Sequence, residues 1–113
     1  MVQFVMGVGS TARLHTWILQ GLSMGNVVES GSHYLDECID NHYACALGLA
    51  LIGKEGSAAK AMEVFEAALI DDRVPEATIA FGQLLDIPMD LAQKIDLAHR
   101  NGISAREIAT SLA

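Results

Sequence analysis

The stretch Tyr43-Ala44-Cys45-Ala46-Leu47-Gly48-Leu49-Ala50-Leu51-Ile52-Gly53 is apolar along its whole length, and the rest of the chain must fold around it. A segment that is apolar on every side has to be buried on every side. At roughly ten residues it is too short to cross a bilayer, which needs about 20. We therefore expect a central core helix from about His42 to Ile52. Its small residues allow close approach by neighbouring helices.

Helix signals continue on both sides of this stretch. After the possible caps Ser10 and Thr11, apolar residues recur with helical spacing. A short helix is expected over residues 32–39. Further helices are expected to begin near Ser57, Pro75, Pro88 and Ser104, the last with the capping-box spacing to Glu107. The pattern predicts an all-α fold: five to seven short helices around the central apolar helix, in a single domain over residues 10–113.

Residues 1–9 are predicted to form an N-terminal arm, with a possible short strand over residues 2–6. The chain has 113 residues, of which 51% are hydrophobic, a high fraction for a small soluble monomer. The apolar side chains of the arm have no obvious place in a helical core. We therefore expect a homodimer in which the arm docks on a second copy of the chain.

Charge and the N-terminal sequence limit the partners and the compartment. The formal net charge is −7, and the seven basic residues are scattered rather than clustered. Proteins that grip DNA or anionic membranes gather lysine and arginine on one surface, so we expect neither partner. No secretory signal pattern opens the chain, which favours a cytoplasmic location and reduced cysteines.

The segment from His33 to Cys45 is the one candidate for metal or ligand binding. Cys38, His42 and Cys45 are spaced i, i+4 and i+7 and would share one face of a continuous helix. Thiolates and imidazoles are zinc ligands, but this spacing matches no familiar zinc pattern. In the simpler interpretation both cysteines are small core residues. We expect no bound metal and no cofactor, and keep these three residues as the candidate ligands.

No arrangement typical of catalysis is present in the sequence. Cys45 lies within the most apolar stretch, where burial raises the pKa of a thiol and makes it inert. Gly7-Val8-Gly9 lacks the third glycine and the strand-to-helix setting of a dinucleotide site. We predict that the protein is not an enzyme and assign no catalytic residue.

The tail over residues 94–109 resembles part of a bacterial helix-turn-helix, with Gly102-Ile103-Ser104-Ala105-Arg106-Glu107-Ile108-Ala109 at its centre. In that motif a further turn and a recognition helix follow. The sequence stops at Ala113, where that turn would begin, so we expect a helical hairpin that closes the core.

Three short islands resemble a group of small, uncharacterised bacterial and phage-type helical proteins. The first is Cys45-Ala46-Leu47-Gly48-Leu49-Ala50, which is similar to the Cys-Ala-Leu-Gly-Ala-Ala segment of that group. The others are Ile18-Leu19-Gln20-Gly21 and the helix from Ser104 to Ala109. The resemblance implies a compact helical protein encoded on mobile or accessory DNA, with no established activity.

Together these observations favour a non-enzymatic interaction module that self-associates and has a further protein partner that the sequence does not identify. One alternative is a regulator that contacts nucleic acid through the C-terminal helical hairpin. The other is a small metal or ligand binder that uses the His33–Cys45 segment.

Overall fold

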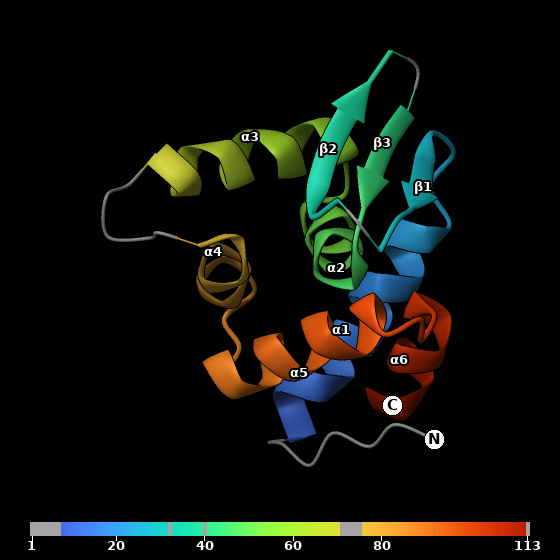
Figure 1. The fold of residues 1–113 in the computed structure, drawn as a ribbon, viewed down its shortest axis with the longest axis vertical. Coiled ribbons are helices and arrows are strands. Elements are labelled where there is room, and N and C mark those ends of the chain that lie inside the picture. The colour runs from blue at the N-terminus through green and yellow to red at the C-terminus, as the bar shows by residue number, and fades with distance from the viewer. Residues whose placement is uncertain (1–7, 32, 40, 71–75, 113) are drawn as a thin grey trace.

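Helix α2 (Ala46–Glu55) lies at the centre of the structure and contacts all five other helices (Figure 1). The computed structural model describes residues 8–31, 33–39, 41–70 and 76–112. Every residue from Ala46 to Gly53 is buried, which confirms the prediction of an apolar central helix. The predicted core residues Leu47, Leu49, Leu51 and Phe65 are also buried.

Six helices lie within the described residues: α1 (Val8–Leu22), α2, α3 (Ala58–Ile70), α4 (Ala77–Leu85), α5 (Met89–Arg100) and α6 (Ala105–Leu112). Two of the predicted caps are formed. Ser57 Oγ accepts a hydrogen bond from the backbone N–H of Lys60, and Ser104 Oγ accepts one from Glu107. Gly102, with φ of 96°, supplies the left-handed turn between α5 and α6. Pro75 lies outside the described residues.

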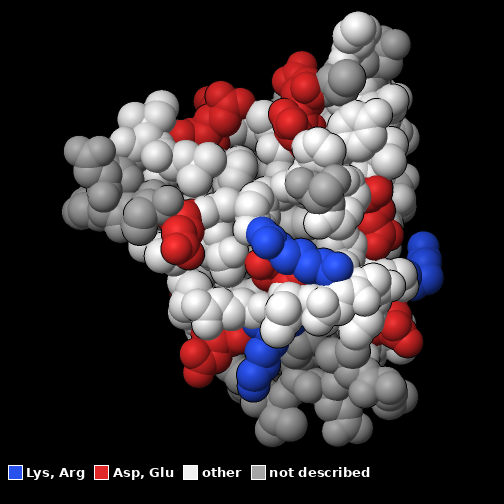
Figure 2. Space-filling view, viewed as in Figure 1, with Lys and Arg blue, Asp and Glu red and all other residues white. Residues whose placement is uncertain are grey.

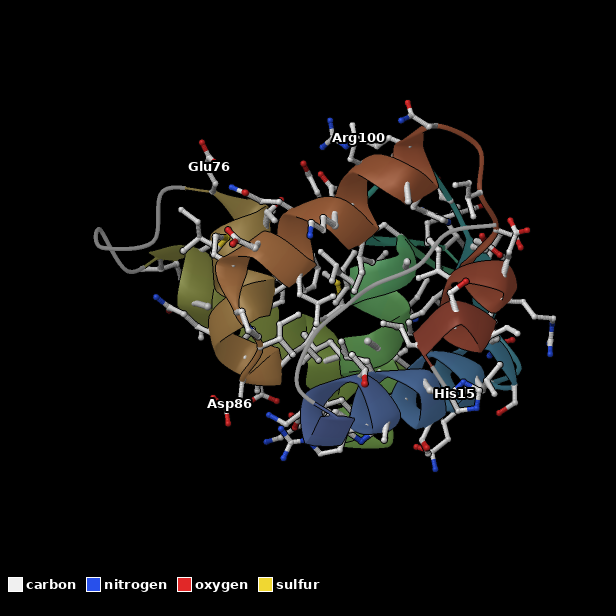
Figure 3. All side chains as sticks on the ribbon, turned by 90° about the horizontal axis from the view of Figure 1, so that it is seen from below. His15, Glu76, Asp86 and Arg100 are labelled. Carbon is white, nitrogen blue, oxygen red and sulfur yellow. The ribbon has the colours of Figure 1, made fainter. Side chains whose placement is uncertain are left out.

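Helices α1 and α2 cross with their backbones in close contact, and glycines make that approach possible. A Cβ placed on Gly53 would lie 1.9 Å from the carbonyl oxygen of Trp17, and one on Gly21 would lie 2.2 Å from that of Leu49. Helix α6 then packs on α1, where the His15 ring donates from Nδ1 to the carbonyl oxygen of Ala109 at 2.6 Å (Figure 3). The first and last described helices are therefore neighbours.

A three-stranded sheet corrects the all-α prediction. Its strands are β1 (Val27–Glu29), β2 (Leu35–Cys38) and β3 (Asn41–Ala44), in the order β1-β3-β2. The middle strand β3 runs parallel to β1 and antiparallel to β2. The segment expected to be a short helix over residues 32–39 is therefore mostly strand, and residues 41–44 are strand rather than the start of the central helix. The arrangement is a mostly helical globule with a small sheet.

The sheet was missed because one apolar run contains two kinds of structure. Residues 43–53 read as a single buried segment, and periodicity does not distinguish a short buried strand from a buried helix. The change occurs at Cys45, whose backbone is extended with φ of −75° and ψ of 179°. Its Sγ then accepts a hydrogen bond from the N–H of Gly48 and caps α2.

Most of the predicted N-terminal arm lies outside the described residues, since the structure describes the chain from residue 8. Val8 and Gly9, which were assigned to the arm, belong to α1. None of the described helices has the length and apolar character needed to cross a bilayer.

Candidate functional site

A small cleft lies between the loop that follows β1 and the C-terminal half of α5. It encloses about 130 Å³. The loop contributes Gly31, His33 and Tyr34, α5 contributes Asp96 and Arg100, and Cys45 lines it from the N-terminal end of α2. The cleft thus gathers residues that are far apart in the sequence.

The wall formed by Tyr34 is fixed against the start of α2. The carbonyl oxygen of Tyr34 accepts a hydrogen bond from the backbone N–H of Cys45 at 3.0 Å. It can come this close because residue 48 is glycine: a Cβ there would lie 2.3 Å from the same oxygen. The apolar segment that forms the core therefore also positions one side of the cleft.

Cys45 is a protonated thiol in this setting. The helix N-terminus would favour a thiolate, and the N–H of Gly48 lies 3.5 Å from Sγ. Burial outweighs this effect and raises the pKa of the Cys45 thiol to about 12, with the nearby carboxyl of Asp96 acting in the same direction. The side chain is therefore a neutral group near neutral pH.

Arg100 lies at the outer end of α5, on the opposite side of the molecule from His15 (Figure 3). Its Nε donates to Asp96 Oδ1 at 3.2 Å, and its guanidinium carbon lies 5.0 Å from the centroid of the Tyr34 ring. The two terminal nitrogens make no hydrogen bond within the described part of the chain. Loss of hydration raises the pKa of the Asp96 carboxyl, and neighbouring His99 opposes this shift.

A wider groove adjoins the cleft, and Gly31 and Arg100 line both. In this groove the Glu29 carboxylate oxygen Oε2 accepts from His99 Nε2 at 2.7 Å and from the backbone N–H of Ala105 at 2.8 Å. His99 is 5% exposed. Glu29 thus links β1 to the end of α5 and the start of α6.

The three candidate metal ligands do not share a helix face, because the segment that carries them is a hairpin followed by a helix. Cys38 ends β2 and pairs in register with Asn41, whereas His42 pairs with Glu37. The His42 ring lies 3.8 Å from the Glu37 carboxylate, and Cys45 is the cap of α2. Within the described residues, no group of three or more His, Cys, Asp or Glu side chains could hold a metal ion.

The predicted C-terminal hairpin is formed by α5 and α6. On the face shown in Figure 2, lysine and arginine side chains lie among aspartate and glutamate rather than in a patch of one sign. Arg100, the basic residue nearest the turn on α5, is paired with Asp96. This face does not have the clustered positive charge that phosphate binding requires.

The cleft and the sequence-based candidates overlap only in part. His33, Tyr34 and Cys45 lie in the segment from His33 to Cys45 that the sequence offers for ligand binding, whereas Asp96 and Arg100 lie outside it. The i, i+4 spacing of Asp96 and Arg100 does indicate an ion pair. Nothing local indicates that Tyr34 lies beneath that pair.

Comparisons with protein-family models, curated proteins and solved structures found no match for this chain.

Proposed function

We propose that this chain is a non-enzymatic binding module that holds a small polar ligand in the cleft between residues 31–34 and α5. The observation that carries the proposal is that His33, Cys45, Asp96 and Arg100 line one cleft. Ligand sites in proteins are preformed hollows in which a few convergent polar groups fix the orientation of the ligand. This function is a form of the ligand-binding alternative that the sequence offers, with residues of α5 in place of Cys38 and His42 and with Cys45 retained.

The size of the cleft sets the size of the ligand. Its volume of about 130 Å³ is close to that of an engineered cavity, about 150 Å³, that binds benzene. A molecule of about six non-hydrogen atoms therefore fits. The adjoining groove leaves room for a larger molecule to extend past Arg100.

The chemistry of the cleft supports binding without turnover. A cysteine nucleophile reacts as the thiolate, and burial keeps Cys45 protonated. Asp96 is engaged with Arg100 rather than with a histidine that it could orient as a base.

Nuclear magnetic resonance with amide labelling tests the proposal directly. Mixtures of small polar compounds are added, and we expect selective shifts of the amides of Gly31, Tyr34 and Arg100. The blocking variant is Gly31→Leu, because Gly31 lines the cleft and its position has room for a side chain. Among the described residues beyond its chain neighbours, a Cβ there would meet the His99 carbonyl oxygen at 3.8 Å, an ordinary contact distance. Its control is Gly25→Leu, where a Cβ would meet nothing within 4 Å. If no compound shifts the cleft amides, or if Gly31→Leu binds as well as Gly25→Leu, the proposal is wrong.

Self-association is a second candidate function, favoured by the apolar end of α3. Leu69 and Ile70 are adjacent and are 41% and 80% exposed. If they form a contact between two copies, Ile70→Gln will convert a dimer into a monomer in a solution mass measurement. Leu97→Gln, at an isolated position on α5 that is 61% exposed, will leave the mass unchanged. A wild-type chain that is monomeric at high micromolar concentration would remove this candidate.

A further inference from the structure

We infer that the ligand of the cleft is a small carboxylate held by the two terminal nitrogens of Arg100; this inference rests on the proposed binding function. Among the described residues that line the cleft, Arg100 is the only arginine or lysine. A guanidinium presents its donors in a planar fork that matches the two oxygens of a carboxylate.

The fork of Arg100 is held ready by its neighbours. Asp96 accepts from Nε, which fixes one edge of the guanidinium and leaves the opposite end available. The Tyr34 ring, 5.0 Å from the guanidinium carbon, supports the group from one side. The Arg100 side chain is 51% exposed and lines the cleft, so it is accessible to a ligand. Because its neighbours already hold it, the Arg100 side chain loses less conformational freedom when a ligand binds.

The remaining groups of the cleft admit a carboxylate. Cys45 is neutral because its thiol stays protonated. Among the lining residues that the structure describes, Asp96 carries the one carboxyl group, and its charge is balanced by Arg100 at 3.2 Å. The N-terminal end of α2, whose partial positive charge favours anions, also meets the cleft at Cys45. The chain as a whole is negatively charged, but the described lining of this cleft carries no excess of negative charge.

The test compares propionate with propionamide, which has the same shape and no charge. Both are titrated at constant ionic strength while the cleft amides are followed by nuclear magnetic resonance. We expect propionate to bind about tenfold more tightly than propionamide, since hydrogen bonds between charged groups are about twice as strong as neutral ones. Arg100→Gln and Arg100→Lys should each weaken propionate binding about tenfold, because neither replacement presents the fork. Arg106→Gln, at an exposed arginine outside the cleft, is the matched control and should have no effect.

The outcomes separate this inference from the proposed function. If propionamide shifts the same amides with equal affinity, or if Arg100→Lys binds propionate normally, the carboxylate inference is wrong while the binding function stands. If neither compound nor any member of the wider mixtures shifts the cleft amides, both are wrong. An equal loss in Arg100→Gln and Arg106→Gln would show a general charge effect and would also reject the inference.

Discussion

Replacing Gly53 by alanine should separate α1 from α2, although the change adds only one methyl group. The new Cβ would lie 1.9 Å from the carbonyl oxygen of Trp17 and 2.6 Å from its carbonyl carbon. Ordinary contact at a Cβ begins at 3.4 Å, so the approach to the oxygen is about 1.5 Å too close. The opposing atoms belong to the backbone of α1, so a side-chain rotation cannot relieve the clash.

The size of the effect follows from two opposing contributions. Alanine is favoured over glycine inside a helix by about 1 kcal/mol. Overpacking a core costs about 1–3 kcal/mol, and a clash between two backbones belongs at the upper end of that range. We therefore expect Gly53→Ala to lower the free energy of unfolding by about 2 kcal/mol.

Gly82→Ala provides the matched control. Gly82 is also a buried glycine in a helix, but a Cβ there would meet first the terminal methyl of Met89, at 3.3 Å, which can move. Alanine keeps its advantage over glycine inside the helix at this position. Gly82→Ala is therefore expected to be as stable as the wild type or more stable by up to about 1 kcal/mol. Urea unfolding followed by circular dichroism measures the stability of both variants, provided that the slope of unfolding free energy against urea concentration is unchanged. Equal stability of Gly53→Ala and Gly82→Ala would refute the close-packing argument.

Two further predictions concern Cys45 and Glu29. Burial raises the pKa of Cys45 in the folded chain from 9.0 to about 12. The contribution of Cys45 to the free energy of unfolding, measured against Cys45→Ser, should therefore be complete below pH 9. As the pH rises between these two pKa values, this contribution should be lost at up to about 1.4 kcal/mol per pH unit. Parallel curves of unfolding free energy against pH for the wild type and Cys45→Ser would contradict this. Glu29→Ala leaves His99 Nε2 and the N–H of Ala105 without their acceptor, and should destabilise the fold by about 1–3 kcal/mol in urea. Glu37→Ala is the control, because the Glu37 side chain is 65% exposed and its carboxylate lies 3.8 Å from His42; it should change stability by less than about 0.5 kcal/mol.

The helices could be predicted from the sequence where local chemistry defines them. The hydroxyls of Ser57 and Ser104 cap the helices that follow, and each hydrogen bond spans only three residues. The hairpin could not be predicted in this way, because β3 is the middle strand of the sheet. It pairs with β1, which is at residues 27–29, and that parallel pairing is not encoded in the local pattern of residues 41–44.

The cleft depends even more on contacts between distant segments. Asp96 and Arg100 are one helical turn apart, and their pairing follows from spacing alone. Their position above Tyr34 follows from how α5 packs on α2, together with the hydrogen bond that holds Tyr34 to Cys45. Neither relation can be deduced from the sequence of either segment by itself.

The contact of α6 with α1 also bears on when this protein can fold during its synthesis. Ribosomes make α1 before α6, but one face of α1 packs on this later helix, which begins at Ala105. The His15–Ala109 hydrogen bond spans 94 positions, so it forms only after nearly all of the described chain has left the exit tunnel. Until then the α1 surface that α6 covers stays exposed to water and to other nascent chains. Contacts between residues so far apart in the sequence slow folding relative to proteins of similar helix content whose contacts are local.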